Sequence, residues 1–129
     1  MITDMDEVLT PFVQEQGIGL INASPLHMGM LTEGGPPAWH PAPLAVKEAA
    51  RRVMETYPQA SEVALQFCLQ HPYVATTLVG MSTVEQVRAN VAAASRELDA
   101  DAVAEIRKMV ALVANRSWPS GRPENQDAH

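Results

Sequence analysis

The apolar positions along this 129-residue chain change their spacing several times, and each spacing predicts a different element. Recurrence at every third or fourth residue predicts amphipathic helices over 3–16, 44–56, 83–95 and 100–114. The segment 61–72 is apolar nearly all round, so it predicts a deeply buried helix. Two short apolar runs, 18–23 and 74–79, predict strands. The first lacks alternation, which is typical of a strand covered on both faces in a parallel sheet.

Residues near the helix ends refine these boundaries. Thr3 and Asp4 are candidate caps of the first helix, and Gly17 can end it. Pro11 lies inside the same pattern, so it predicts either a late start near Thr10 or a kink.

Capping signals also mark the later helices. Ser61 is predicted to cap the third helix, Ser82 with Glu85 to form a capping box, and Asp99 to cap the last helix. Each helix then has an inward stripe. The predicted inward positions are Val46, Ala49, Ala50, Val53 and Met54 in the helix 44–56, Val84, Val87, Val91 and Ala94 in the helix 83–95, and Val103, Ile106, Val110 and Val113 in the helix 100–114.

The predicted order of elements leaves the sheet incomplete. A helical connection between the two strands makes them parallel by default. Two parallel strands have open edges and too few neighbours for a stable sheet. The chain is therefore expected either to be a piece of a larger barrel or sheet, which we favour, or to complete its sheet by self-association.

The stretch from Val74 to Asn90 carries the main chemical signal. A strand ends at Gly80 and a helix begins soon after, an order that presents backbone N–H groups to an anion. Ser82, Gln86 and Asn90 follow at intervals of four and would share one helix face. This pattern favours a phosphate- or nucleotide-binding edge. The alternative is that Ser82 only caps its helix and that the two amides are solvated.

Composition narrows the partners and the compartment. The net charge of −6 argues against nucleic acid and anionic membranes. No apolar run reaches the roughly 18 residues of a membrane span. The chain begins without a secretory pattern, and its single cysteine, Cys68, indicates a reducing compartment. We therefore expect one soluble, cytoplasmic domain.

Other chemically interesting residues have simpler interpretations. His27 and His40 have no further ligand at metal-binding spacing, so no metal site is predicted. Cys68 lies in an apolar helix and is expected to be a small core residue. Trp39 and Trp118 lie in proline-rich segments, where they either rim a pocket or cap the core.

Several segments together resemble the C-terminal part of the aldo-keto reductases. They are SPLHMGMLT (24–32), GGPPAWHP (34–41), VALQFCLQHP (63–72), LVGMSTVEQVRANVAA (78–93) and SWPSG (117–121). The second and last are similar to the branch of L-galactose, L-fucose and related aldose dehydrogenases. The resemblance implies an α/β fold that is part of a (β/α)8 TIM barrel, namely its last two βα units and the preceding helix. Residues 1–121 would form this part, with two parallel strands and about five helices, and residues 122–129 a flexible tail.

The resemblance also implies a nicotinamide dinucleotide as cofactor and partner. Carried over by position, the predicted cofactor-binding residues are Ser24, Leu26, Gly29, Leu31, Gly80, Ser82, Gln86 and Asn90. Ser82 stands where NADP-preferring members often have Arg, and Ala89 where Glu is common. These departures slightly favour NAD over NADP.

The family's catalytic Asp, Tyr, Lys and His belong to a stretch that has no counterpart here. Tyr57, Tyr73, Lys47 and Lys108 fall at unrelated positions, so no catalytic residue is predicted. The first functional hypothesis is a fragment of an NAD(P)-dependent aldo-keto reductase that carries part of the cofactor site and is inactive alone. It could pair with the missing N-terminal half or with a second copy. The second hypothesis is a non-catalytic structural or oligomerisation module.

Overall fold

The computed structural model describes residues 5–118 and has the predicted α/β composition. Its elements are α1 (Met5–Gln16), β1 (Leu20–Ala23), α2 (Leu44–Thr56), α3 (Ala60–Leu69), β2 (Val74–Leu78), α4 (Val84–Ala94), α5 (Ala100–Val110) and the 3-10 turn η1 (Ala111–Val113). The predicted caps Thr3 and Asp4 and the predicted tail 122–129 lie outside the described residues. No helix within the described range is long and apolar enough to cross a membrane.

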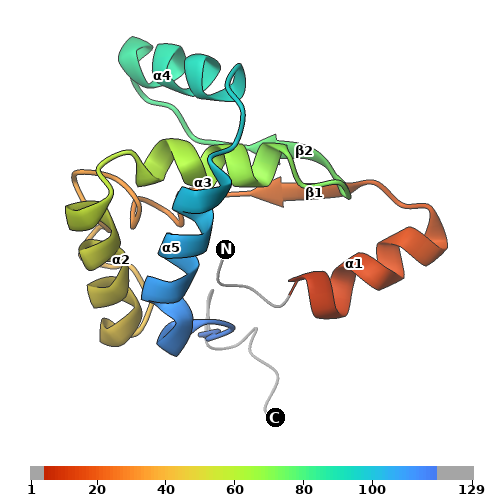
Figure 1. Cartoon of the computed structure of the whole chain (residues 1–129), viewed down its shortest axis with the longest axis horizontal. Helices are drawn as coiled ribbons and strands as arrows, with labels where there is room; N and C mark the ends of the chain where they lie inside the picture. The colour runs from red at the N-terminus through yellow and green to blue at the C-terminus, as the bar shows by residue number, and fades with distance from the viewer. Residues whose placement is uncertain (1–4, 119–129) are drawn as a thin grey trace.

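The two strands pair in parallel, as predicted. Leu20 lies opposite Val74, and Ala23 lies opposite Leu78. In Figure 1 both arrows point the same way, and the loop before α2 and the turn before α4 leave from the arrowheads. The carboxyl ends of both strands therefore meet at one edge of the sheet.

Coverage of the sheet differs from the prediction for 18–23. β1 alternates between half-buried and exposed residues, and Ile21 is 62% exposed. On the same face of β2, Leu78 is 58% exposed. The expectation that the first strand is covered on both faces is thus wrong for the described chain, because nothing in residues 5–118 covers that face.

The core lies between three helices rather than on the sheet. Helices α2, α3 and α5 pack together, with Met30 and Ala42 from the loop after β1 closing the cluster. Among the described residues, neither strand contributes a buried side chain. The predicted stripe of α2 is confirmed at Val46, Ala49, Ala50 and Val53, with Met54 partly buried against the cluster. The stripe predicted for 100–114 is confirmed at Val103, Ile106 and Val110 in α5 and at Val113 in η1.

Helix α1 runs without a break through Pro11, so the predicted late start near Thr10 is wrong. Its end is as predicted, because Gly17 has φ +64° and follows the last helical residue. The N–H of Ile18 then donates to the carbonyl of Val13 at 2.9 Å. This bond satisfies a helix-terminal carbonyl in the manner of a Schellman motif.

Two predicted caps have different outcomes. Asp99 is confirmed, since its carboxylate accepts from the N–H of Ala102 at 2.9 Å. Ser61 is not a cap, because Gln59 precedes α3 and Ser61 lies inside it. The Ser61 hydroxyl instead donates to the carbonyl of Leu31 and ties α3 to the loop after β1.

The predicted buried stripe of α4 is wrong. Val84, Val87, Val91 and Ala94 are all exposed, and Ala93 is the buried residue of this helix. Figure 1 shows α4 standing away from the helical body. The apolar stripe is real in the sequence, but no element of the described chain packs on it.

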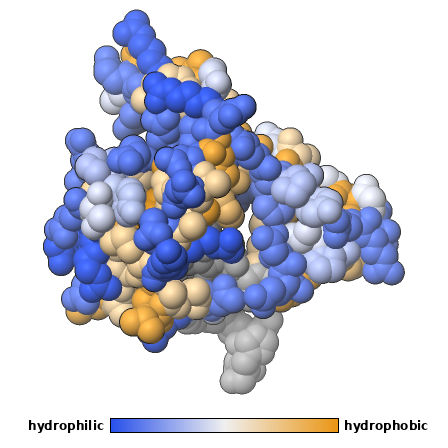
Figure 2. All heavy atoms as spheres, in the orientation of Figure 1, coloured by the Kyte–Doolittle hydropathy of each residue, from blue (hydrophilic) through white to orange (hydrophobic). Residues whose placement is uncertain are grey.

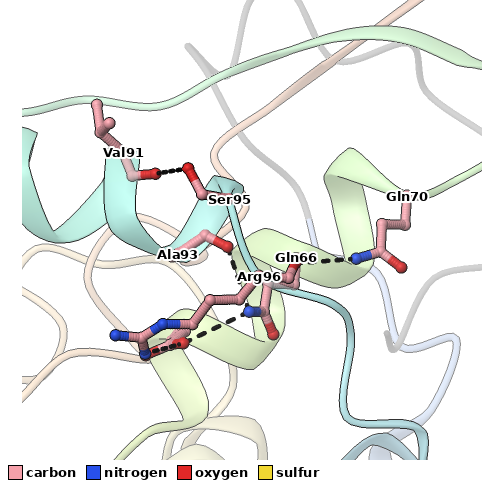
Figure 3. A network of polar contacts seen from close by, with 7 residues as sticks. Gln66, Gln70, Val91, Ala93, Ser95 and Arg96 are labelled. Carbon is pink, nitrogen blue, oxygen red and sulfur yellow. Dashed lines mark hydrogen bonds and ion pairs between the residues drawn. The ribbon is translucent and has the colours of Figure 1, made fainter.

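A polar network attaches α4 to α3 (Figure 3). The side-chain amide of Gln66, which is 4% exposed, donates to the carbonyl of Ala93 at 3.2 Å. Beside it the guanidinium of Arg96 pairs with Glu62 at 2.6 Å. At the end of α3, Gln70 donates to the carbonyl of Arg96 at 3.4 Å.

Helix α1 is separated from the body by a cavity of about 460 Å³ with mostly apolar walls. Figure 2 shows the opening between α1 and the helical body. The imidazole of His71 bridges part of the gap and contacts the carboxylate of Asp6 at 2.7 Å. The cavity reaches the end of β1, where Ser24 and Pro25 line it.

Candidate functional site

The predicted site residues lie in two segments that start at the same edge of the sheet. The N–H of Ser24 donates to the carbonyl of Leu78 at 3.0 Å, which continues the strand pairing beyond β1. The loop 24–43 leaves from one side of this bond, and the turn 79–83 leaves from the other. The carboxyl-end edge of a parallel sheet is where α/β folds bind ligands.

The first segment is a compact turn that contains four of the predicted residues. Ser24 has φ +55°, and Gly29 has φ +93°. The N–H of Leu31 donates to the carbonyl of Leu26 at 3.2 Å. The hydroxyl of Thr32 donates to the carbonyl of Gly29 at 2.8 Å. The carbonyl of Ser24 accepts from the N–H of His27 at 2.8 Å, so all four predicted residues belong to one hydrogen-bonded turn.

The two glycines of the predicted site differ in how strongly the fold requires them. A Cβ at Gly29 would lie 3.1 Å from the carbonyl oxygen of Gly35, and the positive φ adds strain for any other residue. Gly80 is exposed, and a Cβ there would meet nothing within 4 Å. Of these two glycines, only Gly29 is required by both close packing and backbone conformation.

In the second segment, the backbone N–H of Ser82 donates to Oε1 of Gln86 at 2.7 Å, and its hydroxyl donates to the same oxygen at 3.1 Å. The N-cap is Thr83, whose hydroxyl accepts from the N–H of Gln86 at 3.2 Å. The predicted capping box of Ser82 with Glu85 is therefore wrong. Asn90 is half-buried further along α4.

Sequence reasoning missed Thr83 although its signal was present. The segment STVEQ contains two overlapping patterns, Ser82 with Glu85 and Thr83 with Gln86, and both fit a capping box. The structure uses the second pattern, with the Gln86 side chain reaching back to Ser82 rather than to Thr83. An anion approaching the N–H of Ser82 would have to displace the Gln86 amide.

An aromatic cluster supports the loop after β1. The ring of Trp118 lies 5.7 Å from that of His27 and 6.1 Å from that of His40. The ring of Trp39 stacks on His40 at 6.3 Å and is otherwise exposed. Trp118 is partly buried against the core, so of the two interpretations for the tryptophans, core capping applies to this one.

Two titratable groups near this edge are shifted away from their charged forms. Burial lowers the pKa of His27, and the nearby ring of His40 adds to this effect. Burial also raises the pKa of the Cys68 thiol, against a smaller opposing effect of its hydrogen bond with Asn22. Both changes favour neutral side chains at the carboxyl end of β1.

Comparison with known proteins identifies the family. The sequence model described as "Aldo/keto reductase family" matches residues 2–111, which is most of the chain. The chain belongs to the aldo/keto reductase family. It is 39% identical over 125 residues to an L-galactose dehydrogenase of Arabidopsis thaliana, covering 91% of this chain and 39% of that protein.

Solved structures agree with this assignment. The apo form of an aldo-keto reductase from Bacillus halodurans superposes with a TM-score of 0.65 at 27% identity, over 91% of this chain and 42% of that one. Its holo form gives 0.63 at 27% identity, over 91% and 41%. The chain thus spans about two fifths of the length of these relatives. The two parallel strands and five helices formed by residues 5–118 are part of a (β/α)8 barrel, as the resemblance implied.

Proposed function

We propose that this chain is the C-terminal, cofactor-holding part of an NAD(P)-dependent aldo-keto reductase, and that its site holds the adenosine and diphosphate groups of the dinucleotide. Aldo-keto reductases generally use NAD(P)H. The observation that carries the proposal is the hydrogen bond from Ser24 to Leu78, because it brings the loop after β1 and the turn before α4 to one edge. In (β/α)8 barrels the loops after the last two strands frequently bind phosphate.

The proposed roles of the two segments are distinct. The turn with Ser24, Leu26, Gly29 and Leu31 contacts the diphosphate, while Gly80 allows the ligand to approach the backbone. Ser82 and Gln86 lie beside the adenosine ribose, and Asn90 bonds the adenine edge. The lack of a cation at Ser82 supports a slight preference for NAD, because a 2′-phosphate is best bound by Arg or Lys.

The chemistry would require the rest of the barrel. Tyr57 and Tyr73 flank α2 and β2, and Lys47 and Lys108 lie on helices, so none belongs to the strand-end edge. We propose that the chain alone does not reduce carbonyls and that the catalytic residues belong to the remaining βα units. By similarity to an L-galactose dehydrogenase, the substrate class of the complete barrel would be sugars. The proposed compartment is the cytoplasm, in keeping with the unpaired Cys68.

Calorimetric titration of the chain with NAD and with NADP tests the cofactor assignment. Gly29→Ala should weaken binding about tenfold, because forcing a left-handed backbone on alanine costs roughly 1–2 kcal/mol. Gly34→Ala is the matched control in the same loop, since its Cβ would meet nothing within 4 Å. Absence of binding to either dinucleotide, even with the remaining barrel units supplied as a second chain, would contradict the proposal.

A second candidate function, self-association through the open sheet, has one observation in its favour. Exposed apolar residues lie on the open face of the sheet, in the turn after β2 and on α4, namely Ile21, Leu78, Met81, Val84, Val87 and Val91. Exposed apolar patches of this kind often mark protein interfaces. Sedimentation separates the candidates: a monodisperse dimer without nucleotide affinity supports a structural module, and a nucleotide-binding monomer supports the cofactor role.

A further inference from the structure

The turn after β1 has a backbone that needs external support. His27, Met28 and Gly29 are three consecutive residues with positive φ, at +54°, +52° and +93°. For residues other than glycine this conformation costs roughly 1–2 kcal/mol each. Such strain persists only where the surrounding structure fixes the backbone. The question is therefore which groups hold this turn.

Bonds within the turn hold part of it, since the N–H of Met30 donates to the carbonyl of His27 at 3.3 Å. The side chain of His40, from outside the turn, contacts the same carbonyl. Its Nε2 lies 3.1 Å from the carbonyl oxygen of His27, and its Nδ1 lies 3.1 Å from the backbone nitrogen of Ala42. A backbone N–H can only donate and a carbonyl can only accept, so Nδ1 accepts and the proton lies on Nε2. The ring is thus neutral, and it joins two parts of the loop. One is the carbonyl of His27, thirteen residues earlier, and the other is the N–H of Ala42, two residues later.

The surroundings keep this ring in place. His40 is 3% exposed, and Trp39 stacks nearly parallel to it, with 13° between the ring planes. Trp118 lies against it at an angle of 57°. The ammonium group of Lys47 donates to the carbonyl of His40 and fixes its backbone to α2. His40 is therefore attached to the core on one side and to the strained turn on the other.

The bond to His27 also sets the direction of the next amide. The peptide bond between His27 and Met28 is trans, so its carbonyl and its N–H point in opposite directions. Because the carbonyl of His27 points toward the ring of His40 and toward the N–H of Met30, the N–H of Met28 points away from them. Among residues 5–118, no group accepts a hydrogen bond from this N–H.

We infer that His40 is a positioning residue that aims the backbone N–H of Met28 at the diphosphate of the bound dinucleotide, an inference that rests on the proposed function. Ser24 and Gly29, which belong to the same turn, are also proposed to meet this group. Successive backbone N–H groups in left-handed and turn conformations form concave anion sites. The neutral ring of His40 acts only by orienting the backbone, because it brings no positive charge close to the phosphate.

Two substitutions of His40 separate its two hydrogen bonds. His40→Gln carries an amide nitrogen near the position of Nε2, so it keeps the donor to His27. His40→Asn carries an amide oxygen near the position of Nδ1, so it keeps the acceptor for Ala42 but loses the bond to His27. One hydrogen bond contributes about 0.5–1.5 kcal/mol. His40→Asn should therefore weaken NAD binding roughly two- to tenfold, and His40→Gln should bind NAD nearly as well as the wild type.

The amide signal of Met28 in a nitrogen-15 NMR titration reports the ligand contact directly. Saturating NAD should shift this signal in the wild type, whereas adenosine, which has no diphosphate, should leave it unmoved. The inference is overturned if NAD leaves the Met28 signal unmoved, or if His40→Gln and His40→Asn weaken binding equally.

Hydrogen exchange distinguishes failure of this inference from failure of the proposed function. If the wild type binds neither NAD nor NADP, the proposed function fails, and the ligand-directed role of Met28 fails with it. Exchange at residues 27–31 still decides whether His40 holds the turn. His40→Asn should accelerate this exchange and His40→Gln should not, and equal rates would exclude the holding role as well.

Discussion

The side-chain amide of Gln86 closes the first turn of α4 onto Ser82, accepting both its backbone N–H at 2.7 Å and its hydroxyl at 3.1 Å. Two residues predicted to contact the cofactor are therefore hydrogen-bonded to each other. Thr83 completes the arrangement by accepting from the N–H of Gln86. Hydrogen bonds among these side chains fix the beginning of α4. A ligand that binds the N–H of Ser82 must break its bond to Gln86 and replace it.

This arrangement predicts a difference between two neighbouring hydroxyl residues. Thr83→Ala removes the N-cap and should destabilise α4 by about 1 kcal/mol. Ser82→Ala removes only one exposed hydrogen bond and should change stability by less than roughly 0.5 kcal/mol. Native-state hydrogen exchange of the α4 amides measures both. A larger effect at Ser82 would mean that the cap assignment is wrong.

The attachment of α4 to α3 predicts a second contrast. Gln66→Ala removes the buried hydrogen bond to the carbonyl of Ala93, which still accepts from the N–H of Arg96 at 3.2 Å. The substitution should lower the free energy of unfolding by roughly 0.5–1.5 kcal/mol. Gln70→Ala is the matched control on the same helix, because Gln70 is exposed and its bond to Arg96 is long. Urea unfolding followed by circular dichroism compares the two. Equal effects would show that the buried amide has no special role.

One hydroxyl is buried without a partner and should be replaceable. Among the described residues, the Thr77 hydroxyl is the buried side-chain group that makes no hydrogen bond. Burying a hydroxyl without compensation costs roughly 1–3 kcal/mol in proteins, so Thr77→Val should stabilise the chain by about 1 kcal/mol. Thr76→Val, at the adjacent exposed position, should be close to neutral. Thermal unfolding gives both values, and a destabilised Thr77→Val would reveal an unseen partner.

The contact between Asp6 and His71 predicts an acid-dependent step. Partial burial alone would raise the pKa of Asp6, but hydrogen bonds from His71 and Thr10 and the charges of His71 and Arg107 hold it below its ordinary value. A lowered pKa in the folded chain stabilises the fold above the unfolded pKa of about 3.9, and this contribution is lost as the pH falls through the folded pKa.

Asp6→Asn should therefore be less stable than the wild type at pH 7. The difference should begin to shrink as the pH falls below the unfolded pKa of about 3.9, and it should vanish once the carboxyl is protonated in the folded chain as well. The pH dependence of urea unfolding measures this difference. A double-mutant cycle with His71→Gln assigns it to the pair, because the coupling should be present at pH 7 and should decrease with the same pH dependence. A difference that does not decrease on acidification would point to a cause other than the ionised carboxylate.

The sequence predicted elements well where their partners lie within the chain. The stripes of α2 and α5 are buried because these helices pack on each other. The stripe of α4 is equally clear in the sequence, yet Val84 and Val91 are exposed, because burial depends on a partner that the described chain does not supply. The same reason applies to the open face of β1.

The candidate site was predictable in part for similar reasons. The pattern of strand, glycine and helix pointed to the segment after β2, while the segment at Ser24 came from the family resemblance. Both segments follow strand ends, and parallel strands bring such positions to one edge. The role of His40 could not, because it depends on a turn thirteen residues earlier and on two tryptophans far apart in the chain. Local pattern also could not choose between Ser82 and Thr83 as the cap.

The register of the sheet has a consequence for chain entropy. Leu20 and Val74 pair although they lie more than about fifty residues apart, so the sheet forms only when a long loop closes. The entropy of closure grows slowly with length, and each doubling of a loop adds only about 0.6 kcal/mol. The glycine pair at 34 and 35, in the middle of loop 24–43, is therefore the natural position at which this chain could carry an inserted sequence and still keep its strands in register.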